Sequence, residues 1–282
     1  MNILPLHFYV NKVILYSMIK SKGDSGQSVV IGALLLLALF VAFISWFQIT
    51  QVPILNQNAE AENNEMIRTE MFEFQEKSYD SILNDNVNQI SFQTKVDYDY
   101  QISGFQHKIG QFSVTEFNNE PINVIDANQT VSGLPSSMIS LKYTPSYIER
   151  TEIPFIYENG ILIENQTTTG LDKGGQRFIR GNNIYMFEFE TNFVALQSPR
   201  IVFFTVSDRD LQETIITGAN DGNGQQDIKI ELDTNLSEEI WDRLLSNQEH
   251  VKGVSGNGGS IKITLNGTEK YKVYTGKAII EQ

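Results

Sequence analysis

Residues 29–47 read VVIGALLLLALFVAFISWF, an apolar run in which none of the nineteen side chains is ionisable. At about 1.5 Å of rise per residue, a helix of this length spans roughly 28 Å, close to the roughly 30 Å hydrocarbon core of a bilayer. A helix in the core of a water-soluble protein keeps a polar stripe toward solvent, and this run has none. The run therefore predicts a helix that lies in a membrane or in a hydrophobic bundle of helices.

We assign residues 27–53 to this transmembrane or filament-core helix and residues 1–26 to a leader or cytoplasmic segment. The side chains expected to form the membrane anchor are distributed along the run: Val29, Leu34, Leu37, Phe40 and Phe47. Pro53 is expected to kink or end the helix, because its ring removes a backbone hydrogen bond.

The charges on the two sides of the run differ in sign. Three lysines and one aspartate precede it, and glutamates are the first charges to follow it: Lys12, Lys20, Lys22 and Asp24, then Glu60, Glu62 and Glu65. Short flanks rich in lysine stay in the cytoplasm, so the N-terminus is expected inside and residues 54–282 outside. The sequence thus predicts a single-pass protein of the cell membrane with an extracellular C-terminal part.

The composition excludes disulfide bonds and argues against a nucleic-acid partner. The chain has no cysteine, so the outer part must fold around an ordinary core without disulfides. Its formal net charge of −13 argues against nucleic acid as a partner, since phosphates require a basic surface. Four N-x-Ser/Thr sequons are candidate N-glycosylation sites: Asn128, Asn165, Asn235 and Asn266.

The leader has two candidate starts. Residues 1–17 are apolar but interrupted by Pro5, His7 and Lys12, so they make a poor membrane span. From Met18 the chain opens MIKSKGDSGQSVVIGALLLL, a short basic leader that runs straight into the apolar helix. Both Met1 and Met18 remain open as the true start.

This order of lysines, Gly26, Gln27 and an uninterrupted apolar helix resembles the class III signal of archaeal type IV pilins and archaellins. The resemblance implies that a prepilin peptidase cuts between Gly26 and Gln27 and leaves the apolar run on the mature protein. It also implies that the chain is its own partner, through that run, in a surface filament. Asp24 and Ile31 depart from the pilin pattern, so the alternatives are a cut after Gly23 and an unprocessed signal anchor.

Three later pieces are similar to uncharacterised archaeal membrane-anchored surface proteins. They are VPILNQNAEAE at 52–62, SYIERTEIPFIYENGILIE at 146–164 and GQRFIRGN at 175–182. This likeness implies a head of the same kind beyond the anchor.

Residues 54–88 are expected to form a helical stalk. From Ala59 to Leu83 an apolar stripe recurs at helical spacing, namely Ile67, Met71, Phe74 and Ile82. Glutamates are expected on the polar face: Glu60, Glu62, Glu65, Glu70, Glu73 and Glu76. The same stripe also fits an amphipathic helix that covers one face of a sheet.

Residues 89–282 are expected to form a mainly β head, an antiparallel sandwich or barrel of many short strands. Residues 92–102 alternate apolar and polar side chains, which predicts one half-buried strand. Asn159-Gly160 and Asn266-Gly267 each follow an apolar run and predict the hairpins 155–163 and 261–274. Further strands are expected at 139–143, 184–189, 201–206 and 228–232. One helix is expected after Ser237 as its cap, with Ile240, Trp241, Leu244 and Leu245 on its apolar side.

The sequence offers little catalytic chemistry. The three histidines, His7, His107 and His250, are far apart, and no metalloprotease, P-loop or dinucleotide motif occurs. Residues 221–225 (DGNGQ) match only the first part of a calcium loop and are interpreted as a solvated hairpin loop. We therefore expect no catalytic, cofactor or metal residues.

The resulting hypothesis is a non-enzymatic cell-surface protein with a structural or adhesive role, pilin-like, whose apolar helix anchors a β-sandwich head. The alternative is a signal-anchored receptor or accessory binding module that does not polymerise.

Overall fold

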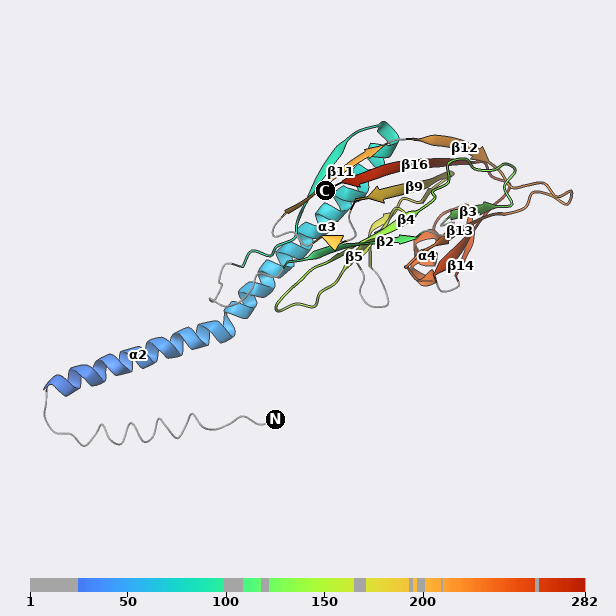
Figure 1. Cartoon of the computed structure of the whole chain (residues 1–282). Coiled ribbons are helices and arrows are strands. Elements are labelled where there is room, and N and C mark those ends of the chain that lie inside the picture. The colour runs from blue at the N-terminus through green and yellow to red at the C-terminus, as the bar shows by residue number, and fades with distance from the viewer. Residues whose placement is uncertain are drawn as a thin grey trace. The chain divides into compact units, whose positions relative to one another are not determined.

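The computed structural model of the chain describes residues 25–98, 109–117, 122–164, 171–192, 195–196, 201–208, 210–256 and 259–281 (Figure 1). The chain divides into two compact units, Met1–Ile54 and Leu55–Gln282, which we describe separately.

The first unit contains helix α2, which runs from Ser25 to Thr50. It ends with backbone and side-chain bonds of its last turn: the Gln51 N–H donates to the Phe47 carbonyl at 2.9 Å, and the Thr50 hydroxyl donates to the Trp46 carbonyl at 2.7 Å. The next helix, α3 (Val52–Asn84), starts after one turn residue and carries Pro53 in its first turn, where a missing N–H costs no helical bond. The apolar helix thus ends at Thr50, three residues before the proline at which a kink or end was expected.

In the second unit, α3 forms the centre of a hydrophobic cluster that we call the α3 core. The predicted stripe is confirmed, because Ile67, Met71, Phe74 and Ile82 are all buried there. Aromatic rings from several strands surround it; the Phe74 ring meets the Tyr157 ring edge-on at 5.1 Å between centroids. Strands of two sheets supply these partners, so the buried face of α3 packs against both sheets, while its opposite face, with Glu65 and Glu73, is exposed (Figure 1).

The same face continues into the first half of α3, but there its side chains are polar. Asn56, Glu60 and Asn63 lie four and three residues apart, in step with the apolar stripe, and all are buried. Glu60 was expected on the wet face, and this expectation is wrong: its exposed fraction is 0%.

Glu60 binds the segment that follows β4. Its carboxylate accepts the backbone N–H groups of Ile148 at 2.6 Å, Glu149 at 3.1 Å and Arg150 at 2.9 Å. It also accepts the Tyr98 hydroxyl at 2.8 Å. Three consecutive N–H groups that converge on one anion form a backbone nest, which explains why a charged side chain is buried here.

The strands form three sheets. Their bounds are β1 Asn88–Gln93, β2 Gln111–Phe117, β3 Ile122–Ile125, β4 Met138–Thr144, β5 Phe155–Glu158, β6 Ile161–Glu164, β7 Leu171–Gln176, β8 Ile179–Arg180, β9 Asn183–Thr191, β10 Ala195–Leu196, β11 Ile201–Asp208, β12 Gln212–Ile216, β13 Ile228–Asp233, β14 Val251–Gly256, β15 Ser260–Leu265 and β16 Tyr271–Glu281. The first sheet has the order β1-β11-β16-β9-β8, with β12 also on β16. The second has the order β10-β2-β4-β5-β6-β7, and the third β14-β15-β13-β3.

The head is mainly antiparallel β, as expected, with one long exception. β9 and β16 pair in parallel over the register from Lys272↔Asn183 to Ile280↔Thr191. Parallel neighbours need a crossover connection, and here strands β10 to β15 and helix α4 (Glu238–Leu245) lie in the chain between them.

The second sheet is buried on both faces at β5 and β6. Tyr157 and Leu162 face the α3 core, whereas Ile156, Ile161 and Ile163 face a second cluster that contains α4, which we call the α4 core. This explains why hairpin β5–β6 is a nearly continuous apolar run. Its turn, Asn159-Gly160, has φ values of 51° and 72°, so both residues are left-handed, as a two-residue hairpin requires.

Two strand predictions are wrong. β15 and β16 do form, but they do not pair with each other: β15 pairs with β13 and β14, while β16 pairs with β9, β11 and β12. The strand expected over 92–102 ends at Gln93, and residues 94–98 instead cover the first half of α3 with Val96 and Tyr98 buried. Residues 99–102 lie outside the described part of the chain.

Helix α4 forms where expected and buries Ile240, Trp241, Leu244 and Leu245. Ser237 is at its N-cap position, but its side chain makes no capping hydrogen bond, so that detail was wrong. Backbone bonds from Ile240 and Trp241 to the Ser237 carbonyl start the helix instead.

The free edge of β1 is covered by side chains of α3. Glu70 accepts the Gln93 N–H at 3.0 Å, Lys77 donates to the Gln89 carbonyl at 3.0 Å, and Asn63 donates to the Gln93 carbonyl at 3.3 Å. Unpaired strand edges otherwise recruit other chains, so α3 both fills the core and caps this sheet. Burial raises the pKa of Glu70 to about 7, with the nearby Glu73 charge adding to the effect and the Gln93 N–H opposing it.

We expect Glu60→Gln to lower the free energy of unfolding by about 2–4 kcal/mol, because an amide leaves some of the converging donors without an acceptor. The measurement is chemical denaturation of the full chain in detergent, followed by circular dichroism. Glu62→Gln, two residues away and exposed, is the matched control and should change stability by less than about 0.5 kcal/mol. Equal effects of the two substitutions would contradict the Glu60 nest.

The raised pKa of Glu70 predicts a pH-dependent stability. The folded state binds this proton more tightly than the unfolded state, so the contribution is complete at acidic pH and is lost as pH rises through about 7. In the wild-type chain the free energy of unfolding should therefore fall as pH rises from about 4.5 to about 7. In Glu70→Gln this fall should be smaller by about 1–2 kcal/mol, after allowance for solvent screening of a half-buried group. An unchanged decline in this variant would refute the assignment.

Candidate functional site

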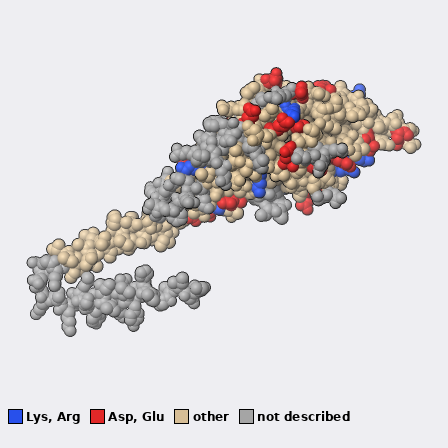
Figure 2. All heavy atoms as spheres, viewed as in Figure 1, with Lys and Arg blue, Asp and Glu red and all other residues tan. Residues whose placement is uncertain are grey.

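The most prominent functional feature among the described residues is the surface of α2. Its apolar side chains are exposed on every side; Val29 is 72% and Leu37 60% exposed, Leu34 and Phe40 are exposed as well, and Phe47 is half-buried. Its sequence contains no lysine, arginine, aspartate or glutamate, and the face of it visible in Figure 2 is uniformly tan. By length and composition, it is the one helix in the described part of the chain that can cross a membrane.

The predicted processing residues lie at the start of α2. Gly26 and Gln27 are in its first turn, directly after Ser25. Residues 1–24, including the lysines and Asp24, are outside the described part of the chain. The position of the proposed cut before the apolar run remains a prediction.

Three of the four sequons lie in the described part of the chain, and Asn165 does not. Asn128 and Asn235 are exposed, and Asn266 is half-buried. All three directly follow or lie close to the ends of strands of the third sheet, β3, β13 and β15. The Asn128 carboxamide accepts the N–H of Thr217, the residue directly after β12, at 2.8 Å.

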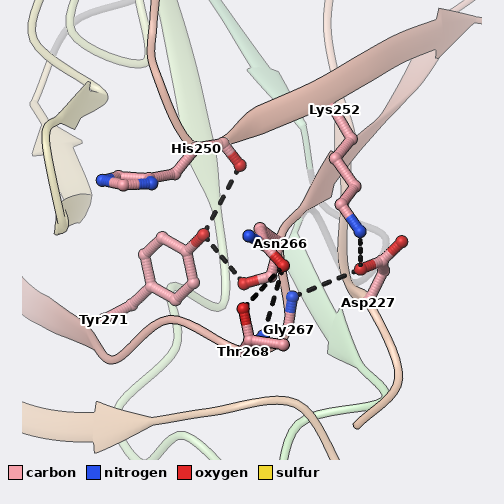
Figure 3. Close-up of polar contacts among 7 residues, drawn as sticks. All are labelled: Asp227, His250, Lys252, Asn266, Gly267, Thr268 and Tyr271. Atoms are coloured by element: carbon pink, nitrogen blue, oxygen red, sulfur yellow. Dashed lines mark hydrogen bonds and ion pairs between the residues drawn. The ribbon is translucent and has the colours of Figure 1, made fainter. Parts of the chain in front are cut away.

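Asn266 belongs to a tightly bonded turn between β15 and β16 (Figure 3). Its side-chain oxygen accepts the Thr268 hydroxyl at 3.0 Å, and its carbonyl accepts the Tyr271 hydroxyl at 3.1 Å. Asp227 accepts the Gly267 N–H at 3.3 Å and forms an ion pair with Lys252 at 2.5 Å, and this lysine lowers the pKa of Asp227. These contacts use the polar groups within the turn itself, so the cluster is structural.

His250 contributes its backbone to this turn, where its carbonyl accepts the Tyr271 hydroxyl at 3.4 Å (Figure 3). Its ring lies edge-on to the Tyr271 ring, 6.4 Å between centroids. His107 lies outside the described residues. Within the described ranges no group of three or more His, Cys, Asp or Glu side chains could hold a metal ion.

The loop considered for calcium is held by its own bonds. Asp221 accepts the Asn223 N–H at 2.9 Å and the Gln226 amide at 2.8 Å, and Asn220 accepts the Gly222 N–H at 3.0 Å. These bonds lower the pKa of Asp221, with Gln226 as the main cause. The loop is an exposed set of Asx turns.

An open groove of about 430 Å³ lies along the start of α3. Its lining is Leu55, Asn58, Ala59, Glu62, Asn63, Met66, Gln93 and Asp97. It holds two carboxylates, Glu62 and Asp97, and Asp97 forms an ion pair with Lys95 at 3.3 Å.

The sequence interpretation missed the buried carboxylates of the head. Glu164 forms an ion pair with Arg68 at 2.8 Å, and Glu158, with an exposed fraction of 0%, has no ion pair among the described residues. Both lie in the run 155–164, which is otherwise apolar apart from its turn. A glutamate inside a run that is apolar on both faces was the available signal, because such a strand has no solvent side on which to place it.

Comparison with known proteins does not assign the chain to a family. No protein-family model, no curated protein and no solved structure matches it.

Proposed function

We propose that the chain is a non-enzymatic cell-surface protein, in which α2 anchors a mainly β head on the outer side of the membrane. The observation that carries this proposal is the uncharged, fully exposed apolar surface of α2. Each large apolar side chain gains about 1.5–3 kcal/mol when it leaves water, so a helix with many of them enters a bilayer or a bundle of helices. The lysines of the leader support a cytoplasmic N-terminus and an extracellular head.

We further propose that the protein is a pilin-like subunit with a structural or adhesive role. Its leader, with Gly26 and Gln27 ahead of the apolar run, supports processing by a prepilin peptidase. The helix that follows the run in sequence, α3, is part of the core of the head. Force on the anchor would therefore reach the head through a helix that is part of its core, which suits a subunit held by α2 in a filament. The exposed sequons Asn128 and Asn235 would carry glycans on such a surface.

The mature N-terminus tests the pilin-like part of the proposal. We expect intact mass and N-terminal peptide mapping of the native protein to begin at Gln27, because the resemblance places the cut after Gly26. A chain that still begins at Met1 or Met18 would replace the filament subunit by an unprocessed, signal-anchored binding module.

Charges placed in α2 test the anchor. The double change Leu37→Arg and Phe40→Arg should move the chain from the membrane pellet to the alkaline-soluble fraction, since each arginine costs about 2.5–3.5 kcal/mol at the centre of a span. Leu211→Arg, at an exposed leucine of the head, is the control and should stay in the pellet. Retention of the doubly charged variant in the pellet would overturn the assignment of α2 as the anchor.

A further inference from the structure

Glu158 is a buried carboxylate whose hydrogen-bond partners are all neutral. It lies at the end of β5 on the face turned to the α4 core, in register with Ser140 of β4 and Ile161 of β6. It accepts the hydroxyl of Thr234 and the backbone N–H of Asn235 at 3.2 Å, and the Ser140 hydroxyl is a third donor. The contact connects the second sheet to the segment between β13 and α4.

Thr234 is also hydrogen-bonded to Trp241. Its oxygen accepts the indole N–H of Trp241 at 3.0 Å and the backbone N–H of Leu236 at 3.0 Å. A hydroxyl oxygen has two lone pairs and one proton, so both acceptor positions are occupied and the proton points to Glu158. Trp241, Thr234 and Glu158 are each buried, so no solvent competes for these bonds.

No cation among the described side chains forms an ion pair with Glu158. The ionisable groups on the elements packed against it are Lys142 on β4, Tyr157 on β5, Glu164 on β6, Asp172 and Lys173 on β7, Lys229, Glu231 and Asp233 on β13, and Glu238, Glu239, Asp242 and Arg243 on α4. Lys142 and the four α4 groups are exposed, and Glu164 binds Arg68. On β7 the neutral Gln176 lies opposite Ile161, and the side chains of Asp172 and Lys173 are outside the described part of the structure.

Two opposing effects therefore act on this carboxyl group. Burial without a counter-ion favours the neutral acid, whereas three donors favour the carboxylate. Burial is the larger effect and raises the pKa of Glu158 to about 7. A neutral acid cannot donate its own proton to Thr234, because both lone pairs of that oxygen are in use, but its carbonyl oxygen can still accept the Thr234 hydroxyl. Protonation therefore removes the charge assistance of this bond.

We propose that Glu158, Thr234 and Trp241 form a proton-sensitive contact, which we call the latch. The charge of Glu158 sets how tightly this contact binds the Thr234–Leu245 segment to β5. In the ionised state the Thr234 hydroxyl donates to the carboxylate in a strong, charge-assisted bond, at the cost of a buried charge. In the neutral state that bond weakens, and the acid proton turns toward Ser140. The latch lies wholly inside the head and does not depend on the proposed anchoring function.

The fluorescence of Trp241 reports the latch directly. The chain has two tryptophans, so Trp46→Phe leaves Trp241 as the sole emitter in the full chain in detergent micelles. We expect its emission maximum to shift in one sigmoidal step with a midpoint near pH 7. Glu158→Gln should abolish the step, and Thr234→Val should abolish it as well, because Glu158 still titrates but has lost its connection to the indole.

Two matched controls separate this latch from other ionisable groups of the head. Glu70→Gln removes a carboxyl group that also titrates at about pH 7 but bonds to β1, and His250→Gln removes a histidine of the turn next to β16. Both should keep the step. The latch is refuted by emission that is flat from about pH 5 to pH 9, or by a step that survives in Glu158→Gln or Thr234→Val.

A second readout needs no change at the latch. In the same Trp46→Phe chain labelled with nitrogen-15 tryptophan, the indole N–H resonance of Trp241 should move with the same midpoint as the emission. A resonance that does not move over this pH range would overturn the proposal even if Glu158→Gln failed to fold.

Discussion

The packing of one face of α3 against two sheets is the constraint on which the head depends. This face must fit both sheets at once, and α3 does so with Ile67, Met71 and Phe74 in the middle of its length. Its other side chains then serve the surrounding backbone: Glu60 binds three N–H groups of one segment, and Glu70 binds the edge of β1. Removing the helix would leave the α3 core open and a strand edge unpaired.

A second consequence follows from placing a sheet between two cores. The strands β5 and β6 have no solvent face, so each glutamate on them is buried. Glu164 is compensated by Arg68, whereas Glu158 has only neutral donors. Both carboxylates are buried, but their surroundings differ. Beside a cation, a buried carboxylate forms an ion pair, whereas with neutral donors alone it becomes sensitive to protonation.

Local signals predicted local structure well. The spacing of Ile67, Met71 and Phe74 predicted helix α3. The pair Asn159-Gly160 predicted the hairpin β5–β6, and the apolar side of α4 predicted that helix. For the two helices, apolar residues recur at the helical period, and for the hairpin, the turn requires residues with left-handed φ values. Non-local choices were missed: Asn266-Gly267 follows a strand, but β15 and β16 take other partners, and β9 pairs in parallel with a strand far along the chain. Turn chemistry does not encode which distant strand will supply the hydrogen bonds.

The sequence by itself determined the apolar helix α2, because nineteen residues without charge have no stable place in water whatever the rest of the chain does. Only the tertiary structure decided which glutamates are surface groups and which are internal. Glu60 and Glu62 differ by two positions on one helix, yet the first is enclosed by a backbone nest and the second is exposed. The reason is physical: the free energy of a carboxylate depends on the donors and the solvent around it, and distant segments bring or exclude both.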